Sequence, residues 1–268
     1  MRRRQLLKVL AFGMMRPDRM IQAALNGANP GLAISSAGGL EDILRPPIVL
    51  EGADFDLMKQ TVKRLQRLQT YVGHGNFNLL GFDQALRLAQ DSASVSAFTK
   101  AEINFLEAIF FADATRYGFL GAKVSPEITA TIPARETVKV HHSGHYLFKG
   151  ESLDFYHRIK KDVGPDLVLT SGIRGIVKQM HLFLRKALAT GGNLSLASRH
   201  LAPPGHSYHG VGDFDVGKRG FGLKNFSPEF ARTEAFQRLL SLGYVQIRYP
   251  AGNPYGVRYE PWHIRVVA

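Results

Sequence analysis

The segment that organises this sequence is Pro203-Pro204-Gly205-His206-Ser207-Tyr208-His209-Gly210-Val211-Gly212-Asp213-Phe214-Asp215. A second segment, Glu260-Pro261-Trp262-His263, follows near the end of the sequence. A divalent zinc ion needs a few nitrogen or oxygen ligands and an open position for water, and a nearby carboxylate that is not a ligand can take the proton of that water. Together the two segments supply histidines and carboxylates for both tasks.

Three motifs occur in a fixed order along the second half of the chain. They are Ser171-Gly172-Ile173-Arg174, then Ser207-x-His209-x-x-Gly212 followed by Asp215, and finally Glu260-x-x-His263. In this order, with the Pro-Pro-Gly that leads into the second motif and the Trp inside the third, they resemble the VanY-like D-alanyl-D-alanine carboxypeptidases and related zinc peptidoglycan peptidases. The resemblance covers roughly the C-terminal half of the chain.

The resemblance implies a role for each matching residue. His209, Asp215 and His263 match the zinc ligands of the family. Glu260 matches the general base that deprotonates the attacking water and later passes the proton to the leaving amine. Arg174 matches a cation that binds the scissile carbonyl and stabilises its developing negative charge.

Four further residues are predicted to lie at the substrate. Ser207 and Gln179 match family positions near the substrate. Tyr208 lies next to His209 in the sequence, and Trp262 lies between the expected base and ligand, where we expect it to form a wall of the site.

The identity of the third ligand stays open between Asp213 and Asp215. The family usually has one more residue between the first histidine and the aspartate than this sequence has. Side chains alternate along an extended strand with a period of two, so both aspartates would point to the same side. We favour Asp215 because Val216-Gly217 also fits the continuation of the family motif.

Composition limits the possible chemistry and partners. The 268 residues include no cysteine, so disulfides are excluded and a metal must be held by histidine and carboxylate. The formal charge of +12 favours binding to polyanions, including the anionic polymers of a cell wall. The charge is scattered and no nucleic-acid-binding signature accompanies it, so we expect no nucleic-acid partner.

We expect three segments along the chain. Residues 1–30 are interpreted as an export leader, because Arg3-Arg4-Gln5-Leu6-Leu7-Lys8 resembles a twin-arginine signal, which favours a periplasmic or cell-envelope location. Residues 31–130 are predicted to form a helical region, and residues 131–268 a zinc peptidase domain. No stretch reaches the roughly 18 apolar residues of a transmembrane helix, so we expect no transmembrane segment.

Local patterns predict an α+β fold in which helices pack on a small, mostly antiparallel sheet. Apolar residues at helical spacing predict a helix over 55–69, and Thr99 with Glu102 forms a capping-box pattern. The segment His141-His142-Ser143-Gly144-His145 is predicted to lie in a loop or to line the cleft, and a second metal site there is the alternative. The remaining expected elements are an extended segment over 128–140, strands over 168–170, 244–249 and 257–267, a helix that starts after Arg174 and ends at Gly191-Gly192, and a helix that starts at Ser227-Pro228-Glu229 and ends at Gly243.

These observations predict a zinc-dependent peptidase acting on D-alanine-containing bonds in peptidoglycan stem peptides, most simply as a D,D-carboxypeptidase. Three alternatives stay open. One is an endopeptidase that cuts crosslinks, and another is a zinc-containing module that binds cell wall without catalysis. The third is a cytoplasmic dipeptidase, which would require that Arg3-Arg4 is not an export signal. Glu260 discriminates between catalysis and binding, because a pure binding module needs no general base.

Overall fold

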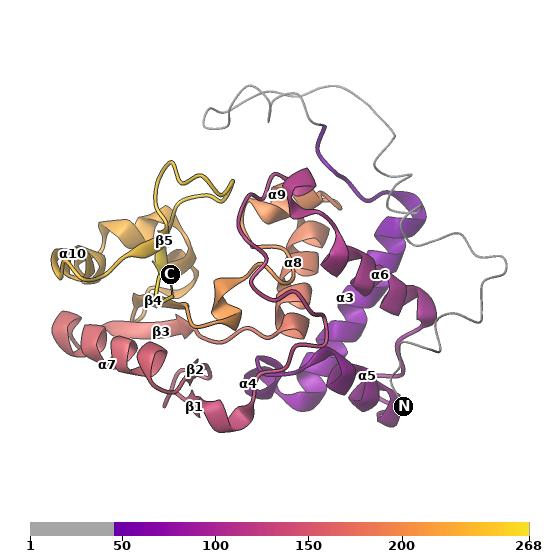
Figure 1. Cartoon of the computed structure of the whole chain (residues 1–268), viewed down its shortest axis with the longest axis horizontal. Coiled ribbons are helices and arrows are strands. Elements are labelled where there is room, and N and C mark those ends of the chain that lie inside the picture. Colours follow the sequence, from indigo (N-terminus) through magenta and orange to yellow (C-terminus); the bar gives the residue numbers. More distant parts are fainter. Residues whose placement is uncertain (1–45, 268) are drawn as a thin grey trace.

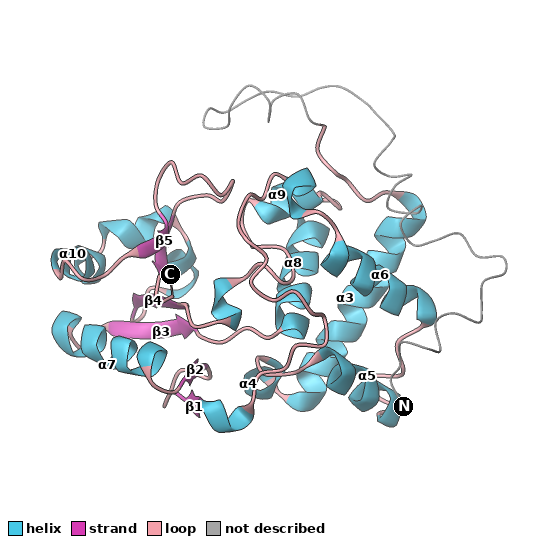
Figure 2. Cartoon of the chain, viewed as in Figure 1, coloured by secondary structure: helices cyan, strands magenta, loops and turns pink. Residues whose placement is uncertain are grey.

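The computed structural model describes residues 46–267 as an α+β structure in which a mainly helical part lies beside a small sheet with its own helices (Figure 1). The buried apolar residues form two hydrophobic cores. Helices form one core, and a small antiparallel sheet with flanking helices forms the other (Figure 2). The predicted fold class is thereby confirmed. The expected leader, residues 1–30, lies outside the described residues.

The helical region begins with α3 (Gly52–Val72), whose apolar residues recur at helical spacing and bury one face. It continues through α4 (His74–Phe77), α5 (Phe82–Asp91) and α6 (Lys100–Phe111). The predicted capping box is confirmed: Thr99 accepts from the backbone N–H of Glu102, and the Glu102 carboxylate accepts from that of Thr99. Arg64 of α3 also binds Glu102, 2.8 Å away, and so fastens the start of α6 to α3.

The first core does not end where the helical region was expected to end. Helix α8 (Ile176–Ala189) lies inside the segment predicted as the peptidase domain, yet its buried face, including Val177, Met180 and Leu184, packs in the same core as α3 and α6. Short helix α9 (Leu194–Ser198) joins it there. The helical region and the predicted peptidase segment therefore share a core across residue 131.

The larger sheet has four antiparallel strands in the order β3-β4-β6-β5. These are β3 (Leu167–Ser171), β4 (Phe214–Lys218), β6 (Glu260–Ile264) and β5 (Ile247–Tyr249). Phe214 and Val216 face the second core, where they meet α7 (Glu151–Val163) and α10 (Glu234–Ser241). Because strand side chains alternate, Asp215 faces the other way, towards the segment that leads into α8.

The remaining elements are short and connect these layers. Strands β1 (Thr137–Lys139) and β2 (Tyr146–Phe148) pair in a separate hairpin. The 3-10 helices are η2 (Ala114–Tyr117), η3 (Ala134–Glu136), η4 (Tyr208–Gly210), η5 (Gly222–Phe226) and η6 (Pro228–Arg232).

Several predicted elements are shorter than expected. The extended segment over 128–140 contains only β1 as a strand, and the strands expected over 244–249 and 257–267 are reduced to β5 and β6. The helix expected from Ser227 to Gly243 is divided into η6 and α10. Thr233 is extended at this break, and its hydroxyl caps α10 by accepting from the N–H of Phe236.

Across residues 46–267, no helix is both long and apolar enough to cross a membrane.

Candidate metal centre

Three residues that were predicted as ligands meet in one buried group: His209, Asp215 and His263. Nε2 of His209 lies 3.1 Å from Oδ1 of Asp215. Nδ1 of His263 lies 3.7 Å from the same oxygen. His209 Nε2 and Asp215 Oδ1 are buried without a hydrogen-bond partner. Buried polar atoms rarely lack a hydrogen-bond partner. The two unpaired atoms face each other, so they indicate a place for a ligand that both can bind.

The donor set and its spacing suit a zinc ion. Zinc bonds to histidine nitrogen and carboxylate oxygen are about 2.0–2.1 Å long, so tetrahedral ligand atoms lie roughly 3.3 Å apart. The two distances to Asp215 Oδ1 bracket this value. Two imidazoles and one carboxylate also leave a fourth position open, as in catalytic zinc sites.

The sheet positions two members of the group. Asp215 on β4 and His263 on β6 are direct partners across the antiparallel pair, so their side chains project from the same face. Their strand neighbours Phe214 and Ile264, also partners, point into the second core. Alternation along the two strands therefore separates the polar group from the apolar core.

His209 is positioned by a local turn rather than by a strand. It lies on η4, and its ring Nδ1 is 2.8 Å from the carbonyl oxygen of Gly172. A carbonyl oxygen only accepts hydrogen bonds, so the proton must be on Nδ1, and Nε2 is left free to face Asp215. Burial lowers the pKa of His209 to about 4, with the charge of Arg174 acting in the same direction, so the ring is neutral at ordinary pH.

His263 is oriented by Asp213. Its Nε2 lies 3.2 Å from Oδ2 of Asp213, which leaves Nδ1 facing Asp215. The carboxylate of Asp213 is held in turn by two hydrogen bonds from Arg248, of 2.7 and 3.0 Å, and by the backbone N–H of Val266. Burial alone would lower the pKa of His263, but its hydrogen bonds to Asp213 and Glu260 outweigh burial and raise the pKa to about 9.

This arrangement separates the two aspartates that the sequence left as alternatives. Asp215 belongs to the three-residue group, whereas Asp213 lies against the opposite nitrogen of the His263 ring. Burial would raise the pKa of Asp213, but His263 and Arg248 outweigh it and hold the pKa well below the usual range. Asp213 is thus an ionised carboxylate that orients an imidazole.

Glu260 lies beside the group without belonging to it. Its Oε2 is 3.4 Å from Nδ1 of His263, and its side chain is buried. Burial raises the pKa of Glu260 above its usual range. In a regular strand, residues three apart point to opposite faces, but the β5–β6 register shifts between Tyr249↔Glu260 and Ile247↔Ile264. This irregularity allows Glu260 and His263 to meet.

Arg174 lies on the other side of Asp215, in the connection between β3 and α8. Its guanidinium contacts Oδ2 of Asp215, and its Nε donates to the Ser171 hydroxyl at 2.9 Å. Its backbone N–H donates to the carbonyl of His209 at 3.3 Å. The motif residues from three separate segments are therefore brought into one place.

Three other residues were predicted to lie near the substrate, and each has its own contacts in the structure: Ser207, Tyr208 and Gln179. Ser207 is buried just before η4, and the Tyr208 ring lies 3.8 Å from the guanidinium carbon of Arg248. The buried amide of Gln179 donates to the carbonyl of Ala202, and the Oε1 of this side chain has no partner.

Trp262 does not form a wall of the site in this structure. Its side chain is 3% exposed and belongs to the second core, where it packs edge-on against Phe226. Because Trp262 is next to His263 on β6, alternation turns it to the opposite face of the sheet.

The three histidines at 141, 142 and 145 form no second metal group among the described residues. His141 and His142 are exposed in the turn between β1 and β2. His145 is half-buried, and its pKa is lowered to about 4 by burial and by the charges of Arg174 and Lys178. His145 therefore belongs to the surroundings of Arg174.

Arg248 was missed at the level of the sequence. It is almost fully buried and holds Asp213, which lies 35 residues away. A single arginine in a predicted strand gives no local signal that it binds a distant carboxylate. Its partner, Asp213, was considered only as a possible metal ligand.

Comparisons with known proteins agree with the motifs. Residues 151–268 match the family model described as VanY, D-alanyl-D-alanine carboxypeptidase. This segment is therefore a domain of the VanY type, and the resemblance predicted from the sequence is confirmed for it. The comparison with curated proteins found no match.

Solved structures give weaker likenesses. A vancomycin resistance D,D-dipeptidase, VanXYg, in complex with a D-Ala-D-Ala phosphinate analogue is 21% identical, with a TM-score of 0.41 over 46% of this chain and 51% of that one. VanYB in complex with D-alanine-D-alanine is 24% identical, with a TM-score of 0.37 over 51% of this chain and 81% of that one. A vancomycin resistance D,D-pentapeptidase VanY mutant in complex with Zn(II) is 23% identical, with a TM-score of 0.36 over 51% of this chain and 83% of that one. The match thus spans about half the length of the first of these proteins.

Proposed function

We propose that this protein is a zinc-dependent peptidase that hydrolyses D-alanine-containing bonds of peptidoglycan stem peptides. The observation that carries the proposal is the buried group of His209, Asp215 and His263, with the facing orphan atoms of His209 and Asp215 and with Glu260 beside it. The family match of residues 151–268 supports the class of substrate.

The residues around the group divide the chemistry among them. When bound, zinc supplies a Lewis acid that polarises the scissile carbonyl and acidifies water. Glu260 takes a proton from the attacking water and then gives it to the leaving amine, and its raised pKa suits a group that must do both. Arg174, held by Ser171 and Asp215, presents a fixed positive charge to the carbonyl oxygen as negative charge develops there.

Asp213 and the carbonyl of Gly172 complete the arrangement. Each fixes one histidine ring so that a defined nitrogen faces Asp215. Such partners raise the basicity of a metal-binding imidazole and hold its plane, so the group is organised before a substrate arrives.

Within this class, a D,D-carboxypeptidase is the mode we favour, with removal of a terminal D-alanine as the reaction. The formal charge of +12 would assist adsorption to an anionic cell wall. The Arg3-Arg4 segment supports export by the twin-arginine route to the periplasm or cell envelope, which subcellular fractionation with an antibody to the chain would test.

Mass spectrometry of purified muropeptides tests the proposal. Tetrapeptide, pentapeptide and crosslinked dimers are incubated separately with zinc-loaded protein and with Glu260→Gln. Loss of one alanine from the pentapeptide establishes the carboxypeptidase, and splitting of dimers establishes an endopeptidase instead. If zinc is bound and no muropeptide is changed, the proposal of catalysis fails and a binding module replaces it.

A further inference from the structure

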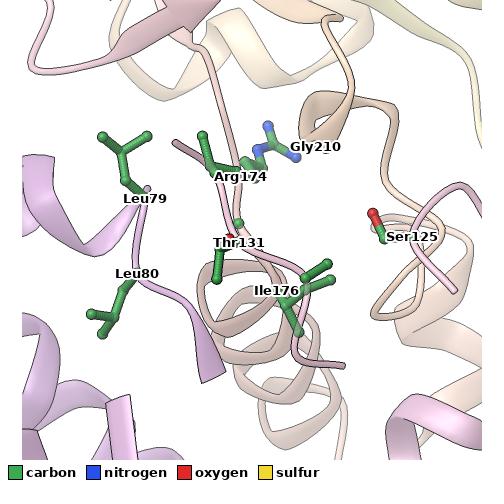
Figure 3. A pocket seen from close by; sticks show the side chains of 10 residues that line it. Leu79, Leu80, Ser125, Thr131, Arg174, Ile176 and Gly210 are labelled. Atoms are coloured by element: carbon green, nitrogen blue, oxygen red, sulfur yellow. The ribbon is translucent and has the colours of Figure 1, made fainter. Parts of the chain in front are cut away.

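A pocket lies between residues of the helical region and the start of α8, with Arg174 among its lining residues (Figure 3). Its enclosed space is about 50 Å³, which is room for a few waters or one small side chain and not for a whole ligand. Two of its lining residues connect it to the candidate metal centre: Arg174 contacts Asp215, and Gly210 follows His209 in the sequence. The lining residues are Leu79, Leu80, Ser125, Ala130, Thr131, Ile132, Arg174, Gly175, Ile176 and Gly210.

Most of this lining comes from outside the family-matched segment. Leu79 and Leu80 lie between α4 and α5, and residues 125–132 belong to the connection that precedes η3. The VanY match begins only at residue 151. The helical half of the chain therefore builds one side of a pocket that adjoins the candidate catalytic group.

The walls are fixed to the catalytic half by backbone contacts. The N–H of Gly175 donates to the carbonyl of Asn78 at 2.7 Å, and the N–H of Ser125 donates to the carbonyl of Gly205 at 2.9 Å. A Cβ at Gly175 would lie 3.1 Å from that Asn78 oxygen, so a larger residue there would push the two segments slightly apart. The pocket is thus preformed, which limits the entropy lost when a ligand enters it.

The lining selects for an uncharged, aliphatic group. Leu79, Leu80, Ile132 and Ile176 supply apolar surface, and Ser125 and Thr131 supply hydroxyls. None of the lining residues, all within the described part of the chain, carries a carboxylate to pair with an amine. Arg174, the only cation of the lining, contacts Asp215 and is assigned above to the scissile carbonyl, so it is not available to pair with a charged side chain. A charged side chain would lose its hydration here without gaining a free partner.

We propose that this pocket is a substrate subsite that receives the short aliphatic side chain of a residue next to the scissile bond. The helical half of the chain then determines which residue is accepted. The inference rests on the proposed function, because it presumes that a peptide lies across Arg174 and Gly210. An apolar pocket can accept the side chain of the residue on either side of the scissile bond. The test below distinguishes the two positions.

The test compares three peptides: diacetyl-L-Lys-D-Ala-D-Ala and its analogues with D-valine in the last or in the penultimate position. Leu79→Ala enlarges the pocket by truncating a half-buried lining residue, and Thr131→Phe narrows the pocket at an exposed lining position. Leu223→Ala and Thr70→Phe are matched controls at exposed positions outside the lining. Values of kcat and KM are measured for every pair of variant and peptide, with zinc content as a check on the metal centre.

We expect Thr131→Phe to lower kcat/KM for the parent peptide about tenfold or more, through KM. We expect Leu79→Ala to raise kcat/KM for one valine peptide, relative to the parent, by about tenfold, since methylene-sized changes in an apolar pocket alter specificity by roughly 10–200-fold. Which valine peptide responds identifies the residue in the pocket. Equal effects on all three peptides, or none beyond those of the controls, overturn the inference.

A second measurement separates this inference from the proposed function. The same peptides are titrated calorimetrically into Glu260→Gln, alone and combined with Leu79→Ala or Thr131→Phe. If the wild type hydrolyses no peptide, the proposed function fails, and the titrations alone decide the pocket. The subsite is supported if Thr131→Phe weakens peptide binding and Leu79→Ala shifts the binding preference towards a valine peptide. The subsite is refuted if no peptide binds, or if neither substitution changes binding.

Discussion

Asp215 lies directly opposite His263 across β4 and β6, with both side chains on the face of the sheet that is turned away from the second core. The backbone ladder sets this register, so the two side chains lie side by side on this face. His209 then needs only one loop to reach the same place, and its Nε2 lies 3.1 Å from Asp215. The sheet thus fixes two of the three candidate ligands in advance.

The first prediction concerns metal content. His263→Ala and Asp215→Ala should each lose stoichiometric zinc, because two ligands from separate segments hold the ion poorly. Asp213→Asn should keep one zinc per chain with roughly 10–100-fold weaker affinity, since Asp213 only orients His263. Elemental analysis gives the stoichiometry, and competition with a chromogenic chelator gives the affinity.

Asp166→Asn, an exposed aspartate, is the matched control and should leave both quantities unchanged. Full zinc content in Asp215→Ala together with loss of zinc in Asp213→Asn would reverse the assignment of the two aspartates.

The second prediction concerns the general base. Glu260→Gln removes the carboxylate but keeps the shape of the side chain, so zinc should stay bound while kcat/KM falls by about 10²–10⁴-fold. Hydrolysis of a D-Ala-D-Ala peptide, followed by release of D-alanine, measures the loss. Glu229→Gln at an exposed site serves as the control, and near wild-type turnover by Glu260→Gln would show that another group takes the proton.

The third prediction concerns Arg174. Arg174→Ala should lower kcat by about 10²–10³-fold and change KM little, because its charge acts mainly on the negative oxygen of the transition state. Arg174→Lys should restore part of kcat, since it returns the charge without the second donor that binds Ser171. An effect of Arg174→Ala on KM alone would assign this residue to substrate binding, and Arg135→Ala, at an exposed arginine, is the control.

The parts of the fold that sequence reasoning anticipated depend on local signals. The apolar spacing of α3, the capping box of Thr99 and Glu102, and the buried run that becomes β3 each report on their own neighbourhood. The residues of the metal centre were found because their order along the chain resembles a family. Their meeting in space follows from the β4–β6 register, which the motifs do not state.

The parts that were missed depend on long-range contacts. Strict alternation would separate Glu260 from His263, and only the irregular β5–β6 pairing allows them to meet. Trp262 was expected at the site because it lies between two functional residues, but its place on β6 turns it into the core. Arg248 binds Asp213, and α8 shares a core with α3. Both contacts join distant segments, and no local sequence pattern predicts them.

The last prediction concerns His181, a fully buried imidazole on α8 whose two ring nitrogens have no hydrogen-bond partner. Burial lowers its pKa to about 3, with Lys178 and Arg185 acting in the same direction. An unfolded histidine has a pKa near 6.5, so between about pH 6.5 and pH 3 the unfolded chain binds the proton more readily. The free energy of unfolding therefore decreases as pH falls through this range.

His181→Leu should remove this dependence. The variant should be at least as stable as the wild type at pH 7, because an unpaired polar ring is replaced by an apolar side chain in an apolar core. Its advantage should grow as pH falls from 6.5 towards 4, as measured by urea unfolding at a series of pH values. His157→Leu, at an exposed histidine of α7, controls for the loss of a titratable ring. A constant difference across this range would mean that His181 accepts its proton in the folded protein with an ordinary pKa.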